Sequence, residues 1–181
     1  MILRRARPLW RTGIDVLMFL VVLALALKVF NFFGSFDLDP GNARSMDGDS
    51  LQLNKTEVRL HGIDAPEFGQ TCGSPSGDYP CGRDAQKALA TLIRERMISC
   101  TVMDVDRYGR SVAICHDGPL ELNREMVRLG WAVAYIRHST AYLAAQREAK
   151  AAKRGMWRGK FEMPEDYRRK HQPVASSVAA D

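Results

Sequence analysis

The sequence lacks several patterns that would assign it to a class of protein directly. It has 4 cysteines but no Cys-x-x-Cys pair, which argues against a structural zinc site. It shows no internal repeat, which excludes a repeat architecture. Its other bulk properties are ordinary, since 181 residues suit one domain with an appendage and 46% apolar residues suffice for a globular core.

The net charge of the predicted globular part of the chain is also small. The overall charge is +5, but the N-terminal flank, residues 1–12, holds four arginines and no acidic residue. Residues 41–181 carry 21 Lys and Arg against 18 Asp and Glu, which is a net charge of only +3. The basic isoelectric point is therefore weak evidence for a nucleic-acid partner.

One long apolar run is present near the N-terminus. Residues 16–27 are all apolar, and residues 13–33 supply the roughly 20 helical residues that a bilayer crossing requires. Because the arginines precede this run, the positive-inside rule predicts a single-pass anchor in the cytoplasmic (inner) membrane. The N-terminus would be cytosolic and the domain periplasmic or extracellular. A cleaved signal peptide has the same charge pattern and would give a secreted protein, but no convincing Ala-x-Ala site follows the run.

The cysteines fit an exported domain, because disulfides persist in oxidising compartments. Cys72 and Cys81 bracket a loop rich in Gly, Pro and Ser. Cys100 and Cys115 lie equidistant from residues 107–108, so a hairpin that turns there would place them directly opposite each other. Opposed residues of antiparallel strands are ~4.5–5.5 Å apart, within disulfide range. We predict two disulfides, Cys72–Cys81 and Cys100–Cys115; four free buried thiols would suit a cytosolic protein instead.

The pattern after a polar linker at residues 34–42 predicts strands, a helix, a hairpin and two further helices. We expect Ser139 to cap the last of these helices. This order favours an α+β domain over residues 43–160, built as a small OB-type barrel with packed helices. Residues 161–181 would be a C-terminal tail. The strands are predicted at residues 43–46, 50–53, 56–60, 98–105 and 110–115, and the helices at 82–96, 122–129 and 139–154.

Charged residues that suit phosphodiester cleavage are grouped in three short segments. Such cleavage needs a water that is aimed and deprotonated, and stabilised charge on the phosphorane, often with a hard cation held by oxygen ligands. Residues 47–49 form an Asp-Gly-Asp turn, residues 59–67 contain an arginine and two carboxylates, and residues 106–110 contain two arginines and a tyrosine. Each segment alone is more often an ordinary turn or a solvated strand face.

Together and in this order, the segments resemble those of the staphylococcal nuclease (thermonuclease) family. The family hallmarks are D-G-D-[ST], R-L-x-G-[IV]-D-[AT]-P-E and D-x-Y-G-R, and this sequence reads MDGDSLQL, VRLHGIDAPE and VDRYGRSVAI. Further on, ELNREMVRLGWAVAY and AAKRGMW are similar to the later helices of the family. The resemblance extends from Ala43 to Trp157 and implies an OB-fold five-stranded β-barrel, here preceded by a transmembrane helix.

The resemblance also implies a metal site and a base. Asp49 and Asp64 would bind Ca²⁺ with their carboxylates, and Ala65 would add its backbone carbonyl. Glu67 would orient or deprotonate the attacking water. Charge arguments agree, because three neighbouring carboxylates repel one another and need a cation.

Five further residues would hold the substrate if the resemblance is followed. Arg59 and Arg110 would clamp the phosphate and stabilise the transition state. Arg107 and Tyr108 would contact a neighbouring phosphate, and Tyr135 would stack on a base or sugar. Such enzymes accept DNA and RNA and leave 3′-phosphate ends.

The chain departs from the family pattern most clearly after Glu67. Where the type enzyme has a flexible lysine-rich loop, this sequence has the loop between Cys72 and Cys81, and no Lys or Arg occurs between Glu67 and Arg83. This change bears on substrate affinity and preference but leaves the residues of the chemistry in place.

The main hypothesis is a monomeric Ca²⁺-dependent nuclease that acts on DNA, RNA or both outside the cytoplasmic membrane. The alternative is a catalytically silent OB-fold module that binds nucleic acid or protein, although such modules usually lack several of the acids and arginines. A third reading is a tethered structural module whose basic run at residues 168–171 binds anionic lipid, or is simply solvated.

Overall fold

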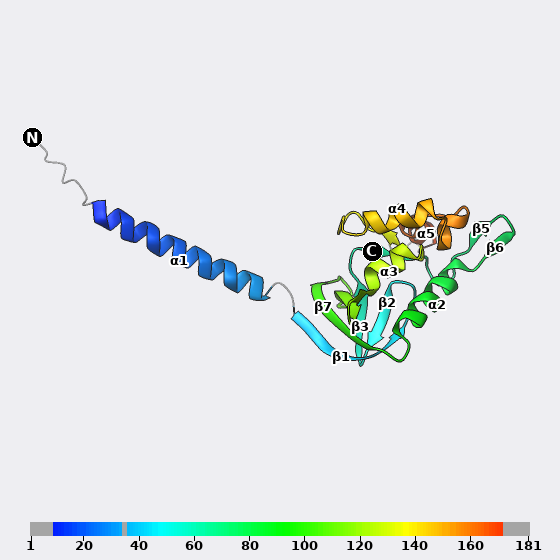
Figure 1. Ribbon diagram of the computed structural model, residues 1–181, viewed down its shortest axis with the longest axis horizontal. Coiled ribbons are helices and arrows are strands. Elements are labelled where there is room, and N and C mark those ends of the chain that lie inside the picture. The colour runs from blue at the N-terminus through cyan, green and yellow to red at the C-terminus, as the bar shows by residue number, and fades with distance from the viewer. Residues whose placement is uncertain (1–8, 34–35, 172–181) are drawn as a thin grey trace, which may run out of the picture. The chain divides into compact units, whose positions relative to one another are not determined.

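The chain divides into two compact units, Met1–Phe36 and Asp37–Asp181, which are described separately. The structure is a computed structural model that describes residues 9–33 and 36–171 (Figure 1). The predicted cytosolic flank, the linker and the C-terminal tail lie partly outside the described residues, at positions 1–8, 34–35 and 172–181. The described part of the linker belongs to a strand, and residues 164–171 of the tail form a helix, so neither is the irregular segment that the sequence predicts.

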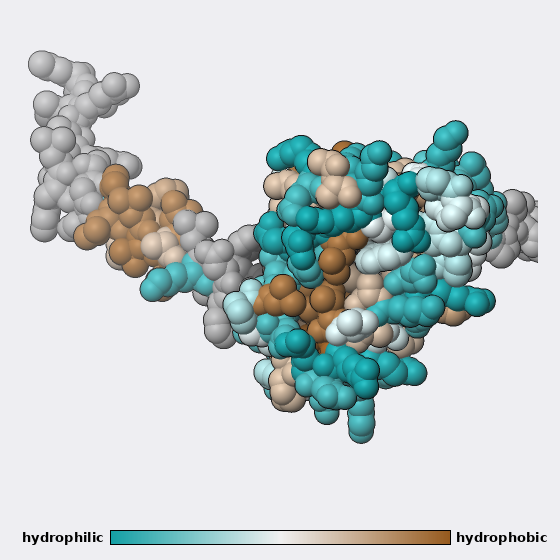
Figure 2. Space-filling model, turned by 45° about the vertical axis from the view of Figure 1, so that its right-hand side comes forward, coloured by the Kyte–Doolittle hydropathy of each residue, from teal (hydrophilic) through white to brown (hydrophobic). Residues whose placement is uncertain are grey.

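The N-terminal unit contains one helix, α1 (Leu9–Phe33). The large apolar side chains from Val16 to Leu23 are all exposed, and Figure 2 shows this apolar surface on the helix. Among the residues whose side chains the structure describes, no helix has both the length and the apolar character that a membrane crossing needs. The anchor at residues 13–33 stays a prediction.

The second unit is built around a closed β-barrel, which confirms the predicted α+β class and OB type. Its sheet has the strand order β3-β2-β1-β7-β8-β9, and a further pairing of β3 with β8 closes five of these strands into a ring. The closing pair is parallel, whereas β2 pairs with both β1 and β3 in antiparallel fashion. The strands are β1 (Phe36–Ser45), β2 (Ser50–Leu53), β3 (Thr56–Leu60), β7 (Met97–Val105), β8 (Ser111–Asp117) and β9 (Leu120–Glu121).

Two small sheets lie outside the strands that the sequence predicts. β4 (Ile63–Asp64) pairs with β10 (Val133–Ala134), and β5 (Cys72–Ser74) pairs with β6 (Gly77–Tyr79). Strands of two or three residues are too short to show an alternating pattern, so no periodicity in the sequence indicates them. The first of these sheets matters for function, because β4 carries Asp64.

The α-helices of this unit agree with the sequence in number and place up to residue 160, but not in their ends. The first ends at Ile93 rather than residue 96, and Glu95 beyond it has a positive φ of 56°. Ser139 does not cap the helix predicted from it. Its hydroxyl accepts a hydrogen bond from the Ala141 N–H in a turn, and the helix starts later. The helices are α2 (Cys81–Ile93), α3 (Leu122–Arg128), α4 (Leu143–Ala151), the 3₁₀ helix η1 (Gly155–Arg158) and α5 (Pro164–His171), of which η1 and α5 were not predicted.

One buried polar residue fastens α3 to the parallel closure of the barrel. The Asn123 side chain has no exposed surface; its carbonyl oxygen accepts from the Cys115 N–H, and its amide donates to the backbone oxygens of His61 and Ala113. These bonds join α3 to the end of β3 and to β8. They hold together the two strands that adjoin the predicted catalytic residues at 59–67 and 106–110.

Both predicted disulfides are present. Cys100 of β7 lies directly opposite Cys115 of β8, with the two Cα atoms 4.1 Å apart. Cys72 is bonded to Cys81, with a Cα–Cα distance of 5.6 Å, and links β5 to the first residue of α2. The Cys72–Cys81 disulfide therefore ties the loop that follows Glu67 to the start of α2.

Candidate active site

Asp49 lies at the end of the Asp-Gly-Asp turn, directly before β2. Its own N–H donates to the Asp47 carboxylate, which sets the turn. A side chain on Gly48 would collide with the methyl groups of Ala65 and Ala85, so the turn packs tightly onto the rest of the domain. The buried carboxylate of Asp49 accepts hydrogen bonds from the Ala65 N–H at 3.1 Å and from Arg59 Nη2 at 3.0 Å. The three predicted residues Asp49, Arg59 and Ala65 are therefore in direct contact.

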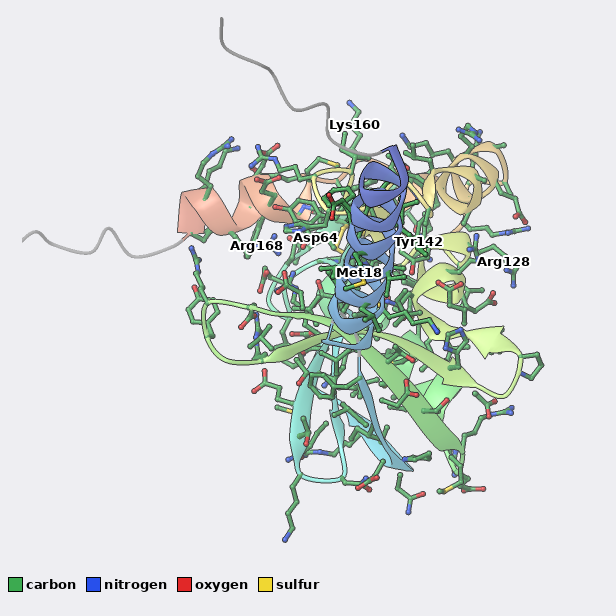
Figure 3. All side chains as sticks on the ribbon, turned by 90° about the vertical axis from the view of Figure 1, so that its left-hand side faces the viewer. Met18, Asp64, Arg128, Tyr142, Lys160 and Arg168 are labelled. Carbon is green, nitrogen blue, oxygen red and sulfur yellow. A yellow bond between two sulfur atoms is a disulfide. The ribbon has the colours of Figure 1, made fainter. Side chains whose placement is uncertain are left out.

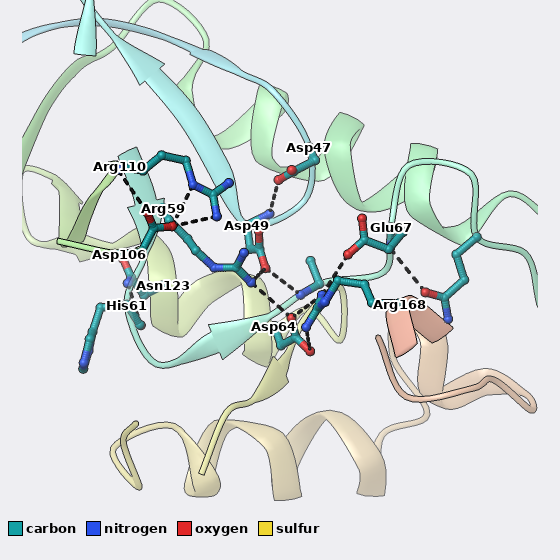
Figure 4. Close-up of polar contacts among 12 residues, drawn as sticks. Asp47, Asp49, Arg59, His61, Asp64, Glu67, Asp106, Arg110, Asn123 and Arg168 are labelled. Atoms are coloured by element: carbon teal, nitrogen blue, oxygen red, sulfur yellow. Dashed lines mark hydrogen bonds and ion pairs between the residues drawn. The ribbon is translucent and has the colours of Figure 1, made fainter. Parts of the chain in front are cut away.

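Asp64 is brought to the same place by β4. Its Oδ1 lies 3.3 Å from Arg59 Nη2, the nitrogen that also contacts Asp49. Arg59 is opposite Ser50 in the β2–β3 pair, so the barrel itself positions its side chain. One guanidinium nitrogen thus joins two buried carboxylates that are 15 residues apart in the chain, as Figure 4 shows.

The two carboxylates have too little positive charge around them. Burial raises the pKa of Asp49 to about 7, although Arg59 acts in the opposite direction. Burial also raises the pKa of Asp64, against the opposing effect of Arg168 and Arg59. The arginines therefore do not fully compensate the desolvation of the two acids, and an additional cation would stabilise their charged forms.

A hard divalent cation fits this set of donors. Carboxylate and backbone carbonyl oxygens are the ligands that Ca²⁺ prefers, and the carbonyl of Ala65 follows Asp64 directly in the chain. Among the residues that the structure describes, no group of three or more His, Cys, Asp or Glu side chains could hold a metal ion. A cation here would depend on the two carboxylates and the backbone carbonyl that the resemblance implies, with water completing its ligands.

Glu67 is the accessible acid of the group. Its side chain is 40% exposed, compared with 7% for Asp49 and 1% for Asp64. Its N–H donates to the Oε1 atom of Gln70 at 3.2 Å, and the fully buried Gln70 amide donates to the backbone oxygen of Glu162. The buried Gln70 side chain therefore holds the backbone of Glu67 in place, while the Glu67 carboxylate reaches the surface.

The sequence missed one residue of this cluster, Arg168 of α5. Its guanidinium lies 2.8 Å from Asp64 Oδ1 and 2.8 Å from Glu67 Oε1. The signals for its helix were available: Pro164 at the first position, acids in the first turn and bases in the last. Nothing in the local pattern shows that one of those bases points into the domain, so the sequence indicates Arg168 only as part of a solvated or lipid-binding run.

Arg110 is held by the turn between β7 and β8. Asp106 accepts from the N–H groups of Tyr108 and Arg110, and Gly109 has the positive φ of 82° that the turn requires. The Arg110 Nε atom lies 2.8 Å from Asp106, and Nη1 lies 3.5 Å from Glu57. Although partial burial opposes it, this pairing raises the pKa of Arg110, which keeps the guanidinium charged.

A pocket of about 610 Å³ brings the predicted substrate residues together. Arg107 donates to the Tyr108 hydroxyl at 2.7 Å and lies over its ring, 66% of Tyr108 being exposed. The Tyr135 ring centre lies 4.9 Å from that of His138. Arg59 and Arg168 line the pocket and also contact the carboxylates, so they lie between the pocket and Asp64. The predicted residues that line the pocket are Arg59, Arg107, Tyr108, Arg110 and Tyr135.

Comparison with known proteins points to one family. A model described as "Staphylococcal nuclease homologue" matches residues 57–159. The succinoglycan biosynthesis protein ExoI of Rhizobium meliloti is 37% identical over 127 residues, which cover 67% of this chain and 66% of that protein. An uncharacterized endonuclease of Haemophilus influenzae is 31% identical over 147 residues, which cover 76% of this chain and 78% of that protein.

A plant relative shares only this domain. The probable staphylococcal-like nuclease CAN3 of Oryza sativa subsp. japonica is 33% identical over 128 residues, which cover 69% of this chain and 32% of that protein. The chain thus spans about one third of the rice protein and slightly less than two thirds of the rhizobial one.

Proposed function

Because the chain belongs to the staphylococcal nuclease family, we propose that it is a nuclease that hydrolyses phosphodiester bonds of DNA, RNA or both. The observation that carries this proposal is the contact of one Arg59 nitrogen with both Asp49 and Asp64. It joins acids of two of the three motif segments beside a pocket that Arg110, from the third segment, also lines. A silent binding module would have no need to keep this complete set.

Ca²⁺ is the cofactor that we propose, held by the carboxylates of Asp49 and Asp64 and the carbonyl of Ala65. When bound, the ion would stabilise the negative charge that develops on the attacked phosphate. The raised pKa of the two aspartates supports this assignment, because such acids gain most from an added cation.

Glu67 would orient the attacking water and accept its proton. It is the most exposed acid of the three, and a residue that activates water must be accessible to solvent. The water would attack the phosphorus in line with the bond to the leaving oxygen. A 3′-phosphate product retains the bond from phosphorus to the 3′ oxygen, so the bond that breaks is the one to the 5′ oxygen.

The arginines would act on the phosphate itself. Arg59 and Arg110 enter the pocket from β3 and from the start of β8, so they can contact different oxygens of one phosphate. Each would stabilise charge that is greater in the transition state than in the bound substrate. Arg107 and Tyr108 would bind the next phosphate, and Tyr135 would stack on a base or sugar.

We further propose that the protein acts as a monomer outside the cytoplasmic membrane. The two disulfides support an oxidising compartment. The apolar run at residues 16–27 and the preceding arginines support a tether with a cytosolic N-terminus. Protease added to intact spheroplasts should then digest the domain. Protection of the domain would contradict this orientation, and a dimeric mass by light scattering would contradict the monomer.

The activity can be tested on the full chain in mild detergent. Single-stranded DNA and RNA should be cleaved in Ca²⁺ and not in a chelator, and the products should carry phosphatase-sensitive 3′ ends. Arg110→Ala should lower kcat by roughly 10²–10³, the usual cost of losing one such donor. Absence of Ca²⁺-dependent cleavage by the wild-type chain would reject the proposal.

Matched controls lie together at the end of α2. Arg94 and Glu95 are exposed and pair with each other, and neither lines the pocket. Arg94→Ala should therefore leave kcat unchanged where Arg110→Ala lowers it. Glu95→Gln should likewise leave kcat unchanged where Glu67→Gln abolishes cleavage.

A further inference from the structure

The C-terminal segment reaches the proposed active site although the family match ends before it. The matched region covers residues 57–159, whereas α5 begins at Pro164. Figure 3 shows Arg168 beside Asp64, and Figure 4 shows its contacts with Asp64 and Glu67. A residue outside the matched region therefore touches two residues on which the proposed chemistry depends.

The contact has the geometry of a fork rather than a single ion pair. Arg168 Nη1 lies 2.8 Å from both Asp64 Oδ1 and Glu67 Oε1, and Nη2 donates to Asp64 Oδ2 at 3.0 Å. The Arg168 side chain is only 25% exposed, so solvent weakens these bonds less than on an open surface. A planar guanidinium fixes both the distance and the direction between two carboxylates, which a flexible ammonium group cannot do.

The same C-terminal segment holds Glu67 by a second route. The backbone oxygen of Glu162 accepts from the buried Gln70 amide, and the Gln70 side-chain oxygen accepts from the Glu67 N–H. Residues 162–168 therefore contact the Glu67 side chain directly and its backbone through one intermediate residue. This arrangement restricts an acid whose side chain is otherwise largely free to change rotamer.

Helix α5 has its own attachments to the domain. Pro164 is buried, Glu165 lies 3.2 Å from Arg137, and Lys170 lies 2.5 Å from Glu162. The helix can therefore stay in place when the Arg168 side chain is removed. This separates the function of the side chain from the folding of the helix.

We propose that Arg168 is a positioning residue of the nuclease site, which holds the Glu67 carboxylate at a fixed place relative to Asp64. Asp64 and Glu67 are like charges three residues apart, and without a cation between them they would repel each other. A displacement of a catalytic group by about 1 Å can cost 10²-fold in rate. This inference rests on the proposed nuclease function, because it gives Arg168 a role toward the base of that reaction.

The kinetic test compares Arg168→Ala and Arg168→Lys with Lys160→Gln, all in the full chain. Arg168→Ala should lower kcat roughly 10- to 100-fold. KM should change less than about threefold, because the terminal nitrogens of Arg168 are bonded to Asp64 and Glu67 rather than left for substrate. Arg168→Lys should be intermediate. Lys160→Gln removes an exposed charge from the same C-terminal segment, outside the residues that line the pocket, and should match the wild type.

Chemical rescue separates positioning from a general structural role. Guanidinium chloride at low millimolar concentration should restore part of the kcat of Arg168→Ala, but none of that of Glu67→Gln. Wild-type kcat in Arg168→Ala would overturn the proposal. A higher kcat would also overturn it and would identify the contact as inhibitory. A loss that guanidinium does not restore, with a lowered unfolding temperature, would overturn it in favour of a structural role.

A measurement without metal or substrate keeps the two proposals apart. Amide hydrogen exchange of a peptide covering residues 64–70 should be faster in Arg168→Ala than in the wild type and unchanged in Lys160→Gln. Equal exchange in all three proteins would overturn the positioning role. If the wild-type chain cleaves no substrate, the nuclease proposal fails, while the exchange experiment still reports whether Arg168 holds Glu67.

Discussion

Asp106 holds Arg110 through both of its carboxylate oxygens. Oδ2 lies 2.8 Å from the Nε and Nη2 atoms of the guanidinium, and Oδ1 accepts from the Arg110 N–H at 3.0 Å. Oδ1 also accepts from the Tyr108 N–H at 2.9 Å. One oxygen therefore shapes the turn and the other directs the guanidinium into the pocket, and the two tasks can be separated by mutation.

Asp106→Asn should impair catalysis more than it impairs folding. The amide oxygen can still accept the two backbone N–H groups, but the charge that holds the guanidinium is lost. We expect kcat/KM to fall about tenfold, less than on removing Arg110 itself, because the arginine stays present but less ordered. The unfolding temperature should stay close to that of the wild type. Steady-state kinetics and thermal denaturation of the same preparation test both statements.

Asp117→Asn is the matched control for that change. Asp117 lies at the other end of β8 and pairs with Arg96 at 2.6 Å, away from the pocket. Its loss should leave kcat/KM unchanged. Wild-type kinetics in Asp106→Asn as well would show that Arg110 does not depend on its acid partner.

Ca²⁺ should stabilise the folded domain through Asp49 and Asp64. At a concentration about 100-fold above the dissociation constant, a ligand that binds only the folded state adds about 2.7 kcal/mol. The wild type should therefore unfold at a higher temperature in Ca²⁺ than in chelator, whereas Asp49→Asn and Asp64→Asn should lose most of this difference. Asp78→Asn, an exposed acid on β6, should keep it. An equal response of all four proteins would argue against the proposed ligands.

The parts of this fold that the sequence predicted correctly depend on local patterns. Strands β2 and β3 alternate and turn at Asn54, so their bounds matched the structure. The equal spacing of Cys100 and Cys115 about one turn predicted their pairing because an antiparallel hairpin preserves such symmetry. The motif residues lie in three short segments between positions 47 and 110, and the family resemblance that these segments carry predicts that they meet.

The parts that it missed depend on contacts between distant segments. Strands β4 and β10 are two residues each and exist only because the folded domain brings them together. Arg168 and Glu67 are 101 residues apart in the chain, and no local sequence pattern indicates a contact over such a separation. Tertiary packing also decided the start of α4, where Tyr142 is buried and the cap predicted at Ser139 gave way to a turn.

Removing the Cys100–Cys115 disulfide should destabilise the barrel without altering the active site. A crosslink that closes a loop of 15 residues is worth roughly 3 kcal/mol through the entropy of the unfolded chain. The Cys100→Ala and Cys115→Ala double variant should lose about that amount in urea denaturation, with kcat unchanged under folding conditions. The Cys72–Cys81 disulfide closes a shorter loop, with a sequence separation of 9. The double variant Cys72→Ala and Cys81→Ala should therefore lose less stability. Stability equal to the wild type in the first variant would contradict the entropic account.

Gly82 should be needed for the position of Glu67, because the two backbones meet where α2 begins. A Cβ atom on Gly82 would lie 2.7 Å from the carbonyl carbon of Glu67 and closer still to its oxygen, and backbone atoms cannot rotate away as a side chain can. Gly82→Ala should therefore displace the segment that carries the proposed base and cost roughly 1–3 kcal/mol of stability, as overpacking does.

Gly69→Ala is the control, since nothing lies within 4 Å of a Cβ atom at that exposed position two residues after Glu67. It adds the same methyl group to the same loop and should keep wild-type stability and kcat. Measured well below its unfolding temperature, Gly82→Ala should still have a lowered kcat, because the folded form itself is changed. If Gly82→Ala lost stability but kept the kcat of Gly69→Ala, the segment would tolerate the shift, and the fixed position of Glu67 would not limit the reaction.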